Sequence, residues 1–296
     1  MKTRAVVTGA TGAQGAAIAR AFAAAGYEVA GLTRGGGRPG PDGVRLVAVD
    51  ESDDGALCVA LEGADVLAFT SPIDHRQGVR ERLAERLARA AEAAGVGRVV
   101  LNTAGAVPDG LDRPVATVLR AVRATVLSGA VPASVVQPTV YMDNLAAPWA
   151  VGPVAAGVLA YPAPSAARVS WVSHATLAAA VVAAAEHPDA PGRTYDIGGP
   201  EPLTGPALAE RLGRVLGRAV RYEAVPLDAF AAGMNAAMGA PAGDDIADLY
   251  RHLAESPDAF ARDGSALAAL GVAPEPFEAW AARQSWPAPA TAAAAD

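Results

Sequence analysis

The octapeptide TGATGAQG (residues 8–15) is the feature that most constrains the fold of this chain. It follows an apolar, β-branched run at 4–8 and opens an alanine-rich run of helical pattern at 13–26. Its glycines, Gly9, Gly12 and Gly15, have the spacing G-x-x-G-x-x-G. Between a strand and a helix such glycines allow a tight turn, close approach of the backbone to a pyrophosphate and close helix–strand packing. The stretch therefore predicts a dinucleotide-binding turn, and the alternative is a purely structural glycine turn.

Strand and helix patterns alternate from this turn to residue 138. Apolar β-type runs predict strands at 27–33, 44–50, 64–70, 97–103 and 133–138. Amphipathic periodicity predicts helices at 75–95, with arginines on its polar face, and at 114–128. This alternation is typical of an α/β protein with a Rossmann-type, doubly wound parallel sheet.

After residue 145 the alternation becomes irregular. We expect helices at 173–188 and 203–218, and strands at 193–199 and 219–226. The predicted organisation is a Rossmann domain at 1–150, to which 166–200 returns, then a small, mostly helical C-terminal lobe on the substrate side at 201–287. The last stretch, 288–296, is expected to be a disordered tail.

Composition excludes several classes of protein. With 296 residues, of which 52% are hydrophobic, the chain can bury a full core. The net charge of −7 argues against nucleic acid as a partner, and no apolar run predicts a signal peptide or membrane helix. Cys58 is the only cysteine and the four histidines are scattered, so no metal site is expected. We expect a cytoplasmic monomer or homodimer that acts on a small molecule.

The second strand predicts which dinucleotide is bound. An acidic residue at the end of this strand is typical of NAD sites, but here the sequence is GLTRGGG, with Arg34 in that place. A guanidinium suits the 2′-phosphate of NADP(H), so NADP(H) is the expected cofactor. The alternative is an exposed arginine in a glycine-rich loop. Asp50, at the end of the third strand, is expected beside the adenine or in a turn.

Several blocks of the sequence resemble the NmrA-like atypical short-chain dehydrogenases, which include isoflavone-reductase-like and quinone-reductase-like enzymes. The resemblance rests on TGATGAQG, on the arginine after the second strand, and on three later blocks that reach to residue 218. These blocks are AAGVGRVVLNTAG (93–105), SGAVPASVVQPTVYMDNL (128–145) and YDIGGPEPLTGPALAERLGRVLGR (195–218).

The resemblance implies positions for the site residues. Thr11 and Gln14 would belong to the cofactor site with the glycines, and Thr70 and Ser71 would follow the dinucleotide. Asn102 and Thr103 would lie beside the nicotinamide ribose, and Pro138 would border the nicotinamide. Tyr141 and Asn144 would face the substrate.

The sequence departs from the family in its proton donors. No tyrosine has a lysine four residues later, and Val118 stands where related reductases carry a lysine. Lys2 is the only lysine of the chain. Arg120 and Arg123 lie on the same expected helix, but a guanidinium is a poor proton donor, so they would orient an anion or form a solvated face.

These residues favour an NADPH-dependent reductase whose substrate needs little acid catalysis, such as a quinone, an iminium or a conjugated enone. Tyr141 and His174 are the candidate polarising groups, although His174 also suits a helix start. Trp149 and Trp171, with Tyr161, would line an apolar substrate pocket or form core. The alternative is a non-enzymatic NADP(H) sensor of the NmrA type, and a smaller one is an isomerase or cyclase.

Overall fold

The computed structural model describes residues 3–35, 39–108 and 110–289. Three predicted parts of the chain lie outside this range: Lys2, residues 36–38 after Arg34, and residues 290–296 of the expected tail. The chain forms two compact units. Unit 1 runs to Thr139 and also contains His174–Ile197 and Gly264–Ala273, whereas unit 2 contains Val140–Ser173, Gly198–Asp263 and the segment from Pro274 onward. The units end at other residues than the expected domains, and the roles of those domains stay predictions.

Unit 1 is built on a sheet of seven parallel strands in the order β3-β2-β1-β4-β5-β6-β8. Its strands are β1 (Arg4–Val7), β2 (Glu28–Thr33), β3 (Val44–Ala48), β4 (Val66–Thr70), β5 (Arg98–Asn102), β6 (Ala133–Pro138) and β8 (Thr194–Ile197). The order reverses between β1 and β4, and such a switch point opens a crevice at the carboxyl ends of the strands. This sheet confirms the predicted Rossmann-type α/β class.

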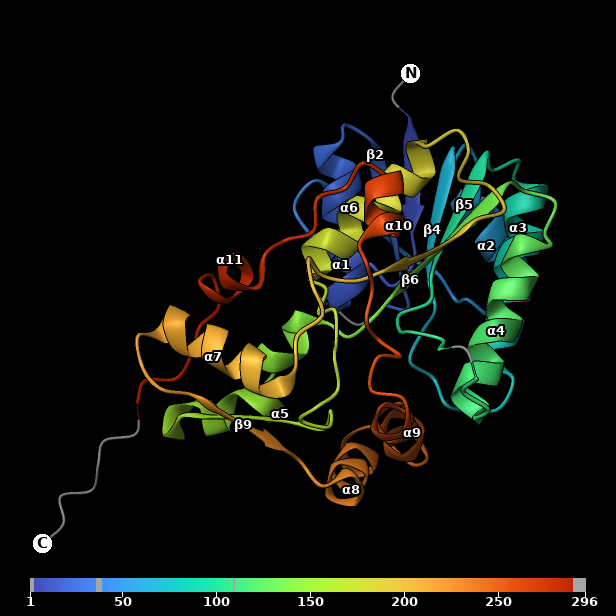
Figure 1. Cartoon of the computed structure of the whole chain (residues 1–296). Helices are drawn as coiled ribbons and strands as arrows, with labels where there is room; N and C mark the ends of the chain where they lie inside the picture. The colour runs from blue at the N-terminus through green and yellow to red at the C-terminus, as the bar shows by residue number, and fades with distance from the viewer. Residues whose placement is uncertain (1–2, 36–38, 109, 290–296) are drawn as a thin grey trace, which may run out of the picture. The chain divides into compact units, whose positions relative to one another are not determined.

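Helices cover both faces of the sheet (Figure 1). On one face α3 packs between α2 and α4, and on the other face α1 packs against α6. The helices of unit 1 are α1 (Ala13–Ala24), α2 (Asp54–Leu61), α3 (Val79–Ala93), α4 (Pro114–Leu127), α6 (His174–Glu186) and α10 (Ser265–Ala269). Helix α2 was not predicted, because a segment of eight residues is too short to show helical periodicity in the sequence.

The core of unit 1 explains why these helices form. Apolar side chains recur every three or four residues on α3, and Leu83 and Leu87 are buried there beside Phe69 of β4 and Leu101 of β5. Each fully buried leucine or phenylalanine stabilises the folded state by about 1.5–3 kcal/mol. Apolar burial on both faces is why the strands read as continuous β-branched runs in the sequence.

Unit 2 is mostly helical, as predicted for the C-terminal lobe. It contains two short parallel strands, β7 (Val158–Tyr161) and β9 (Arg221–Ala224). Strand β7 lies in the stretch that the sequence left irregular, because four residues among prolines and glycines give no clear alternation. The helices are η1 (Met142–Ala146), α5 (Pro148–Val151), η2 (Gly152–Ala156), α7 (Gly205–Leu216), α8 (Leu227–Met238), α9 (Ala242–Glu255) and α11 (Phe277–Ala281).

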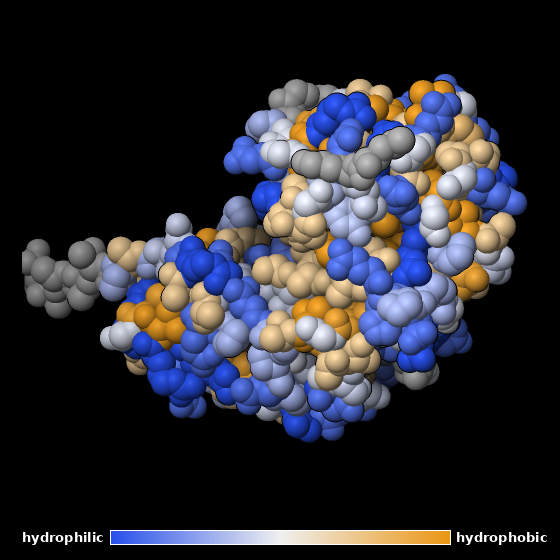
Figure 2. Space-filling model, turned by 90° about the horizontal axis from the view of Figure 1, so that it is seen from above, coloured by the Kyte–Doolittle hydropathy of each residue, from blue (hydrophilic) through white to orange (hydrophobic). Residues whose placement is uncertain are grey.

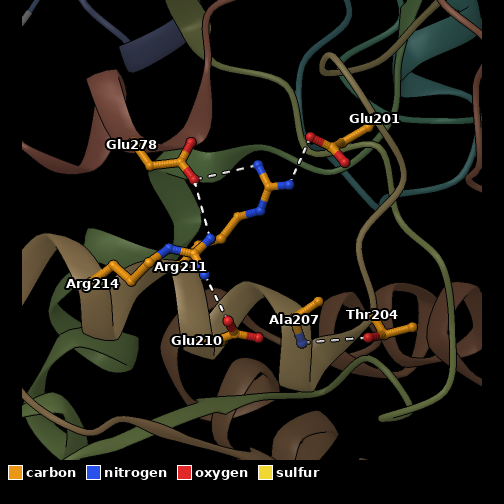
Figure 3. A network of polar contacts seen from close by, with 7 residues as sticks. All are labelled: Glu201, Thr204, Ala207, Glu210, Arg211, Arg214 and Glu278. Carbon is orange, nitrogen blue, oxygen red and sulfur yellow. Dashed lines mark hydrogen bonds and ion pairs between the residues drawn. The ribbon is translucent and has the colours of Figure 1, made fainter.

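Ion pairs join α7 to α11 within unit 2 (Figure 3). Arg211 binds Glu201 at 2.7 Å and Glu278 at 3.3 Å, and Arg214 binds Glu210 at 2.6 Å and Glu278 at 3.8 Å. These side chains are partly exposed, and exposed pairs contribute about 0–1 kcal/mol each. The network therefore orients α11, and apolar burial supplies more of the stabilisation.

Few large hydrophobic side chains of the described residues are exposed. Hydrophilic and hydrophobic residues are interspersed on the face shown in Figure 2. The exposed large hydrophobic side chains of the described chain are Val59, Ile73, Trp149 and Met238, which come from four separate segments. Within the described ranges no helix is long and apolar enough to cross a bilayer, and no three metal-ligating side chains cluster.

Candidate functional site

The turn between β1 and α1 has the geometry of an anion cradle. Gly9 adopts a left-handed conformation with φ of +62°, and Gly12 is the N-cap of α1, where it supplies no side-chain cap. A Cβ at Gly15 would lie 2.6 Å from the carbonyl carbon of Gly9 and 2.9 Å from the oxygen of Thr8. Only glycine therefore lets α1 pack this closely. The first turn of α1 contains no acidic residue, so its amides and helix dipole suit a phosphate group.

This turn forms one wall of a pocket in unit 1 with a volume of about 670 Å³. Five residues expected to bind the cofactor line it: Gly9, Thr11, Gly12, Arg34 and Thr70. The other lining residues are Thr8, Leu32, Thr33, Gly35, Glu51, Ser52, Pro72, Asp74, Arg76, Val79, Arg82, Leu83 and Arg86. The size falls in the range typical of cofactor and ligand sites. The structure thus brings the ends of β1, β2 and β4 together around one cavity.

Arg34 and Glu51 give the pocket two opposite charges. Arg34 is exposed just beyond the end of β2, and Glu51 is half-buried in the turn after β3. Burial raises the pKa of the Glu51 carboxyl, while the positive charge of Arg34 opposes this rise and Asp50 adds to it. Glu51 was not among the predicted site residues, although its place directly after the predicted third strand was a usable signal.

The N-terminal part of α3 and the loop before it add three more arginines to the pocket wall. Arg76 binds Asp74 at 2.6 Å, and Arg86 binds Asp54 at 2.8 Å. Arg82 donates to the carbonyl oxygen of Gln77 at 3.3 Å. The sequence assigned the arginines of this helix to a polar face only. With four arginines and two acids among its lining residues, the pocket favours an anionic ligand.

Asn102 connects the end of β5 to α1. Its Nδ2 donates to Oε1 of Gln14 at 2.8 Å, and its Oδ1 accepts from the backbone N–H of Ala104 at 3.0 Å. Ala104 has φ of +63°, a conformation that non-glycine residues rarely adopt. On the neighbouring strand, the N–H of Thr70 donates to Oγ1 of Thr8 at 3.0 Å. These bonds fix the strand ends around the glycine turn.

The remaining expected cofactor residues lie outside the lining of this pocket. The Ser71 hydroxyl accepts two hydrogen bonds from the buried Arg80 guanidinium, at 3.1 and 3.0 Å. Thr103 donates to the carbonyl oxygen of Gly105 at 2.8 Å, and Pro138 ends β6 opposite Ile197 of β8. Their role in cofactor binding stays a prediction.

Asp50 takes part in a turn. Its Oδ1 accepts from the N–H and the hydroxyl of Ser52, at 2.8 and 2.7 Å. These hydrogen bonds lower the pKa of the Asp50 carboxyl. The predicted contact of Asp50 with adenine stays a prediction.

Arg120 and Arg123 bind neutral acceptors of unit 1. Arg120 donates to the carbonyl oxygens of Pro108 and Leu111, at 3.1 and 2.9 Å. Arg123 donates to Oε1 of Gln137 at 3.4 Å. Both guanidinium groups thus take part in structural contacts around α4.

The aromatic residues of unit 2 gather around Tyr161. Its ring centroid lies 5.7 Å from that of Trp149 and 4.9 Å from that of Trp171. Its hydroxyl lies 2.8 Å from the hydroxyl of Tyr250 and accepts from Nδ2 of Asn144 at 3.2 Å. Burial raises the pKa of Tyr161 to about 12, so its phenol stays protonated near neutral pH. Tyr250 follows Tyr161 by 89 residues, and no sequence pattern indicated their contact.

The two candidate polarising groups belong to different units. Tyr141 is buried in unit 2, where its backbone bridges to Val172. His174 is the first residue of α6 in unit 1, which agrees with a helix start. The structure therefore brings the predicted substrate residues Asn144, Trp149 and Trp171 to Tyr161 and leaves the catalytic roles of Tyr141 and His174 as predictions.

Comparison with known proteins gives a family and several relatives. The profile of the NmrA-like family matches residues 1–269. A (4-alkanoyl-5-oxo-2,5-dihydrofuran-3-yl)methyl phosphate reductase of Streptomyces griseus is 36% identical over 76% of this chain and 78% of its own length. An NAD(P)H azoreductase of Xenophilus azovorans is 30% identical over 84% of this chain and 85% of its own. A nucleoside-diphosphate-sugar epimerase structure from Staphylococcus aureus has a TM-score of 0.79 at 22% identity, covering 95% and 100% of the two chains.

Proposed function

The chain belongs to the NmrA-like family, and we propose that within it the chain is an NADPH-dependent reductase acting on a small electrophilic organic substrate. The observation that carries this proposal is a pocket of unit 1 that is lined by both the glycine turn and Arg34. Two relatives with 36% and 30% identity are named as reductases, and one of these names includes NAD(P)H. Both names support hydride chemistry.

The described residues fit the cofactor. The amides at the N-terminus of α1 would hold the pyrophosphate, because Gly12 adds no competing side chain. Arg34 would bind the 2′-phosphate with charge-assisted hydrogen bonds. Thr11 and Thr70 line the same cavity and would contact the bound nucleotide. When bound, NADPH supplies a hydride from its nicotinamide ring.

The substrate class follows from the proton donors of the chain. Lys2 is the only lysine, and no tyrosine has a lysine four residues later. The sequence therefore lacks the Tyr/Lys pair that protonates the alkoxide in many short-chain dehydrogenases. An iminium already carries positive charge, and the oxygens of a reduced quinone are comparatively acidic, so neither requires a strong acid. The dihydrofuran and azo groups in the relatives' names each contain a reducible double bond. We assign the substrate to the quinones, iminium ions or conjugated enones.

Tyr141 and His174 are the proposed polarising groups. An iminium ion becomes a neutral amine as hydride arrives and needs no proton. With a quinone or an enone, a phenol or imidazole that donates a hydrogen bond to the substrate oxygen stabilises the negative charge that develops there. The final proton comes from this donor or from water. Asn144, Trp149 and Trp171 are the proposed substrate contacts, with the amide for polar groups and the indoles for apolar area.

One assay tests the proposal. NADPH oxidation by the full chain is followed at its nicotinamide absorbance with a panel of quinones, cyclic imines and conjugated enones. We expect turnover with at least one of these classes. NADPH binding without oxidation across the whole panel would overturn the reductase assignment in favour of an NADP(H) sensor. Conversion of substrate without net NADPH oxidation would favour an isomerase.

A further inference from the structure

An acidic run follows β3 and reaches the pocket of unit 1. It contains four carboxylates in five residues: Asp50, Glu51, Asp53 and Asp54. Asp50 binds the N–H and hydroxyl of Ser52, and Asp53 caps α2 by accepting from Ala56 at 3.0 Å. Asp54 pairs with Arg86 at 2.8 Å.

Glu51 differs from its three acidic neighbours. Among the described residues, its carboxylate takes part in no hydrogen bond or ion pair, yet it lines the pocket with Arg34. Electrostatic interaction with Arg34 and with Asp50 acts on it there. Because it is half-buried in the pocket wall, the Glu51 carboxylate is available to a ligand in the pocket.

Glu51 and Arg34 would act in opposite directions on the two nicotinamide cofactors. A carboxylate accepts a hydrogen bond from a free ribose 2′-hydroxyl and repels a 2′-phosphate, whereas a guanidinium attracts the phosphate. On the α3 side Arg86 is paired with Asp54 and Arg76 with Asp74, whereas Arg82 donates to the carbonyl oxygen of Gln77. The charges that act on Glu51 are those of Arg34 and Asp50. The charge of Glu51 therefore acts on whichever group occupies the pocket near Arg34.

We infer that Glu51 determines cofactor preference: it weakens the binding of NADPH and favours NADH, so that the chain binds both nucleotides. This inference rests on the proposed cofactor site. It adds a residue with a defined role, because the sequence rule for this fold considers only the end of the second strand.

The test compares cofactor affinities of the full chain and two variants by isothermal titration. Wild type should bind both nucleotides, with dissociation constants within about tenfold of each other. Glu51→Gln keeps the size of the side chain and removes the charge. We expect Glu51→Gln to bind NADPH more tightly and NADH more weakly than wild type. The preference for NADPH over NADH should therefore rise about tenfold. Glu62→Gln removes one charge from the exposed end of α2 and should leave the ratio unchanged.

The outcomes separate the two proposals. If wild type binds neither nucleotide, the proposed function and this inference both fail. If it binds them and Glu51→Gln leaves the ratio unchanged, only the inference fails. Should Glu51→Gln not fold, Glu51→Ala serves as the second variant, with retained NADPH binding as evidence of folding and the same ratio as the criterion.

Discussion

Gly15 packs against the carbonyl group of Gly9, so closely that a Cβ on Gly15 would lie 2.6 Å from the Gly9 carbonyl carbon. This contact joins the first turn of α1 to the end of β1, and it positions the amides that face the pocket. Because the obstructing atoms are backbone, no side-chain rotation can relieve the overlap.

Gly15→Ala should therefore lower the free energy of unfolding by about 1–3 kcal/mol, the cost of forcing a methyl group into a packed site. NADPH binding should weaken at the same time, because α1 must move away from β1. Urea unfolding and NADPH titration measure the two effects. Gly233→Ala is the matched control, since Gly233 lies within α8 with open space around it. It should stabilise the chain by up to about 1 kcal/mol through helix propensity, and equal effects at both sites would refute the packing argument.

Arg34→Ala should raise the dissociation constant of NADPH at least tenfold, about 1.4 kcal/mol, and change that of NADH by less than about twofold. The reason is that the guanidinium would contact only the 2′-phosphate. Fluorescence titration with each nucleotide measures the difference. Arg20→Ala removes an equal charge from an exposed site on α1 and should have no effect. An unchanged NADPH affinity in Arg34→Ala would leave Arg34 as a simple surface residue.

Tyr141→Phe should lower kcat at least about tenfold with little change in KM, if the phenol stabilises charge that develops only during hydride transfer. Steady-state kinetics with the best substrate of the panel provides the measurement. Tyr195→Phe, a buried tyrosine of β8, is the control and should behave as wild type. A normal rate in Tyr141→Phe would remove this residue from the mechanism.

Tyr161 makes stability depend on pH in the alkaline range. Burial raises the pKa of its phenol from 10.0 to about 12, so the folded state keeps a proton that the unfolded state releases. The stabilisation is complete below pH 10 and is lost as the pH rises from 10 toward 12, at about 1.4 kcal/mol per pH unit. Urea unfolding between pH 9 and 11.5 should show this decline, and Tyr161→Phe should make it less steep. Identical slopes in the two proteins would contradict the assignment.

The sequence predicted the local parts of this structure well. The glycine turn, the seven strands of the parallel sheet and the arginine after β2 are encoded within a few residues each, through β-branched runs and fixed glycine spacing. Helix α2 and strand β7 were missed because eight and four residues carry too little periodicity.

Contacts between distant segments could not be predicted in this way. The sequence pattern predicted Arg82 and Arg86 on the polar face of a helix, and only the packing of α3 beside the ends of the strands brings them to the pocket. Tyr161 and Tyr250 meet because α9 packs within unit 2, a contact across 89 residues. Glu51 was within reach of sequence reasoning, since the carboxyl ends of parallel strands share one edge.

Transfer of deuterium tests the central claim most directly. NADPH that carries deuterium at both C4 positions of the nicotinamide is mixed with the full chain and the cyclic imines and conjugated enones of the panel, and products are analysed by mass spectrometry. The account predicts a product with one carbon-bound deuterium for each NADP⁺ formed. Bound NADPH that delivers no deuterium to any imine or enone and reduces no quinone of the panel would contradict it.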